Sequence, residues 1–145
     1  MADPKAVVRR NIDAMNTHDL DAIMATYTPD AELVWPGGRR VSGTAAIREH
    51  YENLLRAYSD TRIDIEQQYV DGDVVVSEFR NTATHTAPLR LATGETVQST
   101  GKRISMRGVN IARVQGNRLV EDRLYFDRHE FLTQLGLVAA PATVS

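Results

Sequence analysis

Residues 102–136, KRISMRGVNIARVQGNRLVEDRLYFDRHEFLTQLG, contain two apolar-rich runs joined by a tight turn and followed by a short helical segment. The runs at 104–114 and 118–127 predict two strands. Between them, Gly116-Asn117 is one of the dipeptides that supply the positive φ angles of a hairpin turn. This stretch therefore predicts an antiparallel hairpin, closed by a helix over 128–136 that ends at Gly136.

One carboxylate lies on the apolar face of the second predicted strand. Side chains alternate between faces along a strand, so Val120, Asp122, Leu124 and Phe126 share one face. Moving an ionised carboxylate out of water costs several kcal/mol of free energy unless the group is paired or hydrogen-bonded. Asp122 is therefore either the acid–base group of a pocket, an aspartate at the hydrated rim of a cavity, or a structural carboxylate tied to an arginine or a backbone amide.

The register of the hairpin decides which residue lies opposite Asp122. A two-residue turn, Gly116-Asn117, places Asp122 opposite Ile111. A three-residue turn that begins at Gln115 places it opposite Asn110. The sequence leaves both registers open.

The segments before this hairpin change from helical to strand periodicity. Apolar stripes at helical spacing predict helices over 4–15, 20–27 and 44–58, with a short strand at 31–35. From residue 61 the chain alternates like a strand, turns at Asp71-Gly72-Asp73 and continues as a strand over 74–86. Residues 88–101 predict a looser connection, with a hairpin tip at Thr93-Gly94-Glu95. Helices followed by a long antiparallel meander indicate an α+β domain.

Composition narrows the classes of function. With 145 residues and 42% hydrophobic content, the chain fits a single domain over 1–136 with a tail at 137–145. A net charge of −2 without a basic patch argues against nucleic acid as a partner. The absence of cysteine excludes thiolate chemistry and disulfides. Neither a signal sequence nor a membrane span is expected, so the predicted location is the cytoplasm. No pair of histidines has metal-ligand spacing, which predicts no metal.

The opening pair of predicted helices and four short motifs, in this order and spacing, give the chain its resemblance to a known family. The motifs are Tyr27-Thr28-Pro29-Asp30-Ala31-Glu32, Gly43 to Ile47, Arg107 to Val114 and Phe131 to Gly136. The sequence resembles the SnoaL-like polyketide cyclase branch of the NTF2-like superfamily. That resemblance implies a conical α+β fold, in which a curved sheet wraps the N-terminal helices and leaves a pocket, usually in a dimer. It also implies aldol-type cyclisation without metal or cofactor, although other members are isomerases, epoxide hydrolases, dehydratases or non-catalytic proteins.

The resemblance carries over only in part to individual residues. The cyclases commonly have an aspartate in the last strand, and this chain has Leu124 at that position. Asp122 lies two residues upstream, on the same predicted face. Asn110 matches a polar pocket position, and His85 falls where several relatives also have a histidine. Asp127 matches a recurring aspartate and is expected to cap the last helix.

The resulting hypothesis is a cofactor-independent enzyme acting on a small apolar carbonyl compound such as a polyketide intermediate. Asp122 is the expected general acid/base, with His85 and Asn110 as supporting donors. The alternatives for these donors are a structural histidine and an asparagine that bonds to backbone at a bulge. The expected substrate-binding residues are Trp35, Tyr51, Leu124 and Phe126.

The alternative hypothesis is a non-catalytic ligand-binding or assembly module, which the leucine at position 124 favours. In either case we expect a homodimer. Val109 and Ile111 make the outer face of the sheet partly apolar, and such a face suits contact with a second copy.

Overall fold

The computed structural model describes residues 3–91 and 94–139, which form a six-stranded sheet, a small two-stranded sheet and four helices. None of these helices combines the length and the apolar character that a membrane crossing requires. The helices are α1 (Pro4–Asn16), α2 (Leu20–Ala25), α3 (Thr44–Ala57) and α4 (Arg128–Gln134). The strands are β1 (Tyr27–Trp35), β2 (Arg39–Ser42), β3 (Arg62–Asp71), β4 (Val74–Thr84), β5 (Leu89–Arg90), β6 (Thr96–Val97), β7 (Arg103–Gln115) and β8 (Arg118–Phe126).

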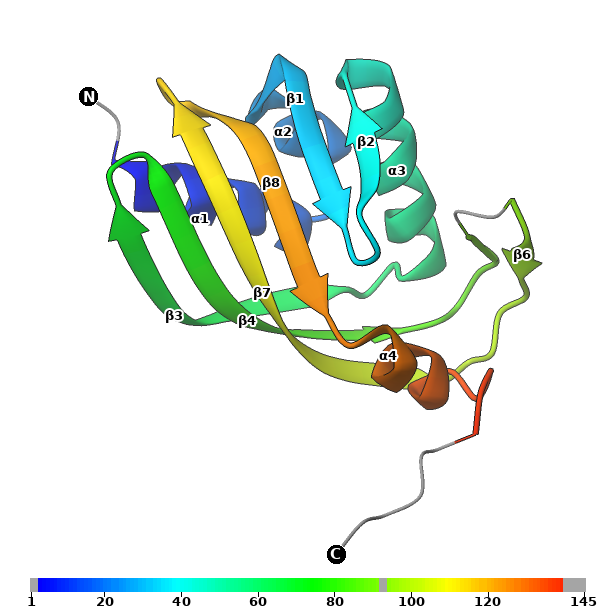
Figure 1. Ribbon diagram of the computed structural model, residues 1–145. Coiled ribbons are helices and arrows are strands. Elements are labelled where there is room, and N and C mark those ends of the chain that lie inside the picture. Colours follow the sequence, from blue (N-terminus) through cyan, green and yellow to red (C-terminus); the bar gives the residue numbers. More distant parts are fainter. Residues whose placement is uncertain (1–2, 92–93, 140–145) are drawn as a thin grey trace, which may run out of the picture.

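The large sheet has the strand order β2-β1-β8-β7-β4-β3 and bends strongly along β4 and β7 (Figure 1). All neighbouring strands are antiparallel except β1 and β8, which are parallel. Helices α1 and α2 cover one face of the sheet, α3 runs beside β2, and α4 follows β8 at the far end. This architecture confirms the predicted α+β class, with a curved sheet around three N-terminal helices and a short C-terminal helix.

Local signals at the ends of the helices match their structures. The side chain of Asp127 caps α4 by accepting a hydrogen bond from the Glu130 amide at 3.1 Å, as predicted. Asp19 caps α2 in the same way, with the Ala22 amide at 3.0 Å. Gly136 follows α4 with φ of 76°, the left-handed conformation that glycine adopts without a steric cost.

Two predictions about the N-terminal half are wrong. Tyr27 begins β1 instead of ending the helical stripe, because α2 stops at Ala25. Residues 39–42, which the sequence does not mark as a strand, form β2 and pair antiparallel with β1. The predicted hairpin tip at 93–95 falls partly outside the described residues, and β5 and β6 pair on either side of it.

The C-terminal hairpin has the two-residue turn, but neither predicted register is correct. Gln115 pairs with Arg118, and one extra residue in β8, Val120, then shifts the pairing by one position. Asp122 therefore lies opposite Ala112 rather than Ile111 or Asn110. A β-bulge of this kind is a local insertion that strand periodicity does not reveal. The bulge also brings Leu119 into the core in place of Val120, and the Leu119 side chain is 1% exposed.

Two apolar clusters fill the fold. The larger one lies between the helices α1 to α3 and the sheet, and includes Val7, Ile23, Leu33, Ile47 and Leu119. The smaller one lies toward α4 and includes Tyr58, Ala83, Leu89, Ile104 and Leu135. Residues from the second cluster and from the margin of the first line a cavity of about 360 Å³.

Candidate functional site

The side chain of Asp122 lies at the centre of a buried polar cluster. Its carboxylate accepts a hydrogen bond from the Tyr27 hydroxyl at 2.9 Å and another from the side-chain amide of Asn110. The hydroxyls of Tyr27 and Tyr51 are 2.6 Å apart, so Tyr51 extends the network. Strands β8, β1 and β7 and helix α3 each contribute one member, and no arginine pairs with Asp122 among the described residues.

Burial dominates the electrostatics of this cluster. Removal from water raises the pKa of Asp122, and the hydrogen bonds from Tyr27 and Asn110 oppose part of that rise. Burial and the nearby carboxylate raise the pKa of Tyr27 and of Tyr51. Both phenols therefore remain protonated at neutral pH, so Tyr27 can donate to the carboxylate while Tyr51 donates to the Tyr27 hydroxyl oxygen.

The cluster lies one row of cross-strand neighbours away from the cavity. Leu124 forms part of the cavity floor and pairs with Asn110 across the hairpin. Asp122 occupies the next inward-facing row, opposite Ala112 and beside Leu33. Asn110 reaches Asp122 as its diagonal neighbour on the same face, a distance that a side chain can span. Asp122 is 9% exposed and does not itself line the cavity.

The predicted substrate-binding residues divide into two groups. Trp35, Leu124 and Phe126 line the cavity. The rings of Trp35 and Phe126 meet edge to face, with centroids 5.5 Å apart. Tyr51 points instead into the cluster around Asp122. The cavity therefore has aromatic walls suited to a flat ligand.

The structure does not bring His85 and Asp122 together. His85 follows the last residue of β4, whereas the row of Asp122 meets β4 at Val75, ten residues earlier. At 3.3 Å per residue, roughly 30 Å of strand separates the two. His85 is fully buried, and its Nδ1 accepts a hydrogen bond from the Thr100 amide at 3.2 Å. Burial lowers the pKa of His85, and its ring lies 5.4 Å from that of Tyr58.

A histidine that the sequence analysis did not select lines the cavity. His50 of α3 is 8% exposed, and its Nε2 has no hydrogen-bond partner in the structure. Its ring meets Trp35 edge to face at 4.7 Å. Burial, followed by the positive charge of Arg39, lowers the pKa of His50 to about 4, so the imidazole is neutral at pH 7. The signal was present in the sequence, because Ile47, His50 and Tyr51 have the i, i+3, i+4 spacing of one helix face.

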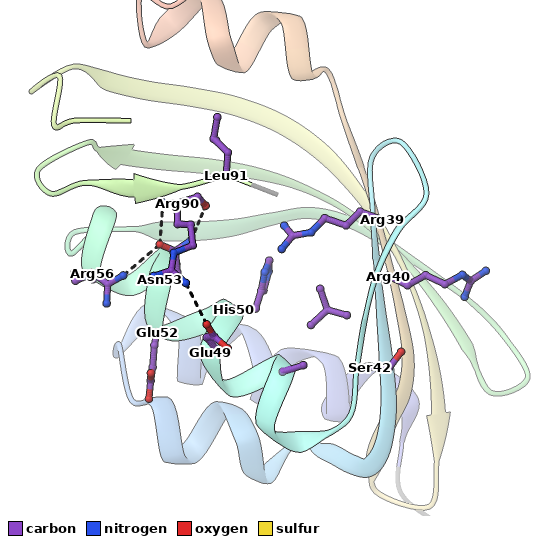
Figure 2. Close-up of a pocket in the computed structure, with 12 residues that line it drawn as sticks. Arg39, Arg40, Ser42, Glu49, His50, Glu52, Asn53, Arg56, Arg90 and Leu91 are labelled. Atoms are coloured by element: carbon purple, nitrogen blue, oxygen red, sulfur yellow. Dashed lines mark hydrogen bonds and ion pairs between the residues drawn. The ribbon is translucent and has the colours of Figure 1, made fainter. Parts of the chain in front are cut away.

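A second, more polar hollow of about 430 Å³ lies between β2 and α3 (Figure 2). The two spaces adjoin, because they share the lining residues Arg39, His50, Asn53, Arg90 and Leu91. Figure 2 shows Arg39 extending toward the His50 ring, whereas Arg40 points away from it. Over residues 3–91 and 94–139, no three histidine, aspartate or glutamate side chains are grouped in a way that could hold a metal ion.

Comparison with known proteins places this architecture in a family. Residues 8–122 match the family model of the SnoaL-like domain. The structure aligns with AclR from Streptomyces galilaeus, a candidate hydroxylase, with a TM-score of 0.78 and 26% identity, over 96% of this chain and 84% of AclR.

Two further solved structures show the same fold. A candidate SnoaL-like polyketide cyclase from Jannaschia sp. CCS1 aligns with a TM-score of 0.81 and 21% identity, over 95% of this chain and 93% of that one. IdmH, a candidate polyketide cyclase from Streptomyces antibioticus, aligns with a TM-score of 0.76 and 22% identity, over 93% of this chain and 99% of IdmH. Because the family model covers most of the sequence and these structures share its NTF2-like fold, the chain belongs to the SnoaL-like domain family.

Proposed function

We propose that this protein is an enzyme that transfers a proton on a small apolar carbonyl compound, such as a polyketide intermediate, bound in the aromatic cavity. The observation that supports this function is the cluster around Asp122. A buried carboxyl group with a raised pKa, which no arginine of the described residues pairs with, lies one row of residues from an apolar cavity. Desolvation makes a carboxylate a stronger base, which suits removal of a proton next to a carbonyl.

In the proposed reaction, a ligand that extends past Leu124 presents its α-carbon to Asp122. The carboxylate takes the α-proton, and the electrons of the broken C–H bond form an enolate. The same carboxyl group then returns the proton at the carbon or oxygen where the product requires it. Asn110 and Tyr27 hold the carboxylate in place through their hydrogen bonds.

The enolate oxygen needs a hydrogen-bond donor from the cavity wall. His50 takes the role that the sequence analysis gave to His85, because it lines the cavity and its Nε2 has no partner. A neutral imidazole that carries its proton on Nε2 donates to the developing charge without adding an acidic proton of its own.

The test is exchange of α-protons for deuterium in 2-tetralone, a cyclic carbonyl probe, followed by NMR in D₂O. Wild-type protein is expected to accelerate the exchange, and Asp122→Asn is expected to slow it by at least about a hundredfold. Asp127→Asn, which changes an exposed aspartate at the cap of α4, provides the matched control and should retain the rate. Thermal melting of each variant confirms that the fold is intact. Full exchange activity in Asp122→Asn would remove Asp122 from the mechanism.

A specific observation also supports the alternative of a binding module without catalysis. The resemblance to the cyclases implies that Leu124 occupies their usual acid position, and in this structure Leu124 lines the cavity whereas Asp122 lies one row farther from it. In that case wild-type protein binds 2-tetralone without exchanging its protons. Leu124→Asp would then introduce the exchange, because it places a carboxylate directly on the cavity floor. Exchange of the 2-tetralone α-protons by the wild-type protein would argue against a binding module without catalysis.

We also propose that two copies of the chain associate through the outer face of the sheet. Val109 and Ile111 are half-buried there, and Tyr69 and Tyr125 are 54% and 48% exposed. Val109 pairs with Tyr125, and Val76 of β4 pairs with both Ile111 and Tyr69, so these side chains share one apolar surface. Sedimentation at micromolar concentration should give a dimer, and Ile111→Glu should give a monomer. A monomeric wild type would refute the proposal.

A further inference from the structure

The charged residues that line the aromatic cavity are all cationic. They are Arg39, Arg90, Arg107 and Arg128, and no aspartate or glutamate lines the cavity among the described residues. Arg90 pairs with Glu49 at 3.5 Å, and Arg107 pairs with Glu66 at 3.3 Å. Neither Arg39 nor Arg128 has a carboxylate within 4.0 Å in the part of the chain that the structure describes. Two arginines therefore border the cavity with their charge unpaired.

These two arginines flank one turn at the mouth of the cavity. Arg39 begins β2 directly after the turn Pro36-Gly37-Gly38. The Nη1 atom of Arg128 lies 3.4 Å from the position that a Cβ atom would take on Gly37. Both side chains are exposed, so an anion at the mouth can meet them without the cost of burying a guanidinium.

The interior behind this mouth suits rings better than ions. Trp35, Phe126 and Phe131 form a chain of ring contacts, with centroid distances of 5.5 and 6.0 Å. The Nε2 of His50 and the hydroxyl of Tyr58 are buried there without a hydrogen-bond partner. Buried polar atoms in native proteins are nearly always bonded. Both residues line the cavity, so a small shift of either side chain would offer its unbonded polar atom to a ligand there.

We propose that the ligand of this cavity is a compound of two or three fused rings that carries a carboxylate, with the rings against Trp35 and Phe126 and the carboxylate bound by Arg39 and Arg128. The proposal rests on the function proposed above and specifies its substrate class. The planar fork of a guanidinium matches a carboxylate with two parallel hydrogen bonds. A cavity of about 360 Å³, near the lower end of the range for ligand pockets, has room for a ring system of this size.

The test compares the binding of two ligands of nearly equal shape, 2-naphthoate and its neutral amide 2-naphthamide, by isothermal titration calorimetry. Neither compound has a removable α-proton, so binding is measured without reaction. The wild-type protein is expected to bind 2-naphthoate about tenfold more tightly than 2-naphthamide. Arg39→Gln and Arg128→Gln should each lower the affinity for the acid by about threefold to tenfold and leave the amide unchanged. Raising the salt concentration should reduce the preference for the acid in the wild type.

Arg40→Gln is the matched control. Arg40 is the next residue in β2, it pairs with Glu32, and it points away from His50 in Figure 2. This variant should bind both ligands like the wild type. A loss of the same size in Arg40→Gln would reduce the effect to general surface charge and overturn the assignment of the two arginines.

The remaining outcomes separate this proposal from the function on which it rests. If acid and amide bind equally, and neither arginine variant changes their affinity, the proposal that the ligand carries a carboxylate is overturned. The proposed proton transfer would then act on a neutral ligand. Binding of neither compound overturns the ring-carboxylate class, and exchange of 2-tetralone then still tests Asp122 by itself. A preference of more than tenfold for 2-naphthyl phosphate over 2-naphthoate would replace the carboxylate by a phosphate ester and thus also overturn the proposal.

Discussion

The cluster around Asp122 and the cavity around His50 are polar regions of the same core with opposite bonding states. Both carboxylate oxygens of Asp122 accept hydrogen bonds from neighbouring side chains. The Nε2 of His50 and the hydroxyl of Tyr58 are equally buried but have no partner. A satisfied cluster fixes how α3, β1, β7 and β8 pack, whereas unpaired donors and acceptors remain available to a ligand. The comparison explains why a buried carboxylate alone does not locate a binding site.

The two regions should respond to pH with opposite signs, and His50 gives the largest expected effect. Its pKa falls from 6.5 in the unfolded chain to about 4 in the folded protein. The contribution of neutral His50 to the free energy of unfolding is therefore complete above pH 6.5. As the pH falls toward 4, the protein loses up to about 3 kcal/mol of this contribution. Urea denaturation of wild type and His50→Gln between pH 4 and 7 measures this difference. The variant should lose less stability in this window, and parallel curves would contradict the lowered pKa.

Asp122 should show the reverse dependence in the same experiment. Because burial raises its folded pKa, its contribution to stability is complete below the unfolded pKa of about 3.9 and declines as the pH rises toward the folded value. Asp122→Asn remains neutral and should lose this decline, so its stability relative to wild type should increase with pH. A relative stability that falls as the pH rises would mean that the native cluster favours the ionised carboxylate.

Removal of one hydroxyl from each region gives a smaller effect that tests the bonding states directly. Tyr27→Phe deletes a donor to Asp122 and should cost about 2 kcal/mol of unfolding free energy, because the carboxylate stays buried. Tyr58→Phe deletes a buried hydroxyl that has no partner, and should be neutral or slightly stabilising. Denaturant unfolding of both variants measures the contrast. Equal losses would show that the Tyr58 hydroxyl is bonded in solution and would remove the distinction between the regions.

The smallest expected effect concerns the cavity alone. A Cβ atom on Gly108 would lie 2.6 Å from Cζ of Phe79, which lines the cavity. Gly108→Ala should therefore push the Phe79 ring into the cavity and lower the affinity for 2-naphthamide by about tenfold or less. Calorimetry measures the loss, and the double variant Gly108→Ala with Phe79→Leu should recover much of it. If Gly108→Ala left ligand binding intact but changed the pH response of Asp122, the two regions would not be separable.

Local sequence signals predicted much of the fold but less of the site. The turn at Gly116-Asn117, the cap at Asp127 and the left-handed Gly136 depend on residues within a few positions of one another. The short strand β2 was missed, because its four residues carry two exposed arginines and little strand periodicity. The helix boundary before Tyr27 was misplaced by the same local reasoning, since a tyrosine suits an apolar position of either element.

The candidate site depended on contacts that local patterns do not contain. The alternation of residues in β8 identified Asp122 as a candidate. Asn110 does bond to Asp122, but the hairpin register differs from both of the predicted registers. Tyr51 was expected to line the pocket and instead bonds to Tyr27. His85 was selected for its type and place along β4, yet the length of the strand keeps it away from Asp122. His50 was overlooked although its spacing on α3 marked the apolar face.

By itself, the sequence determined the order of the elements, the turn and caps that end them, and the resemblance to the SnoaL-like family. Periodicity, turn chemistry and helix capping act over a few residues, so they are visible in a single chain. Only the tertiary structure decided that a bulge at Val120 turns Asp122 toward Ala112, and that α3 brings Tyr51 to the carboxylate and His50 to the cavity. These outcomes follow from packing between segments far apart in the sequence, where small shifts in register change every partner.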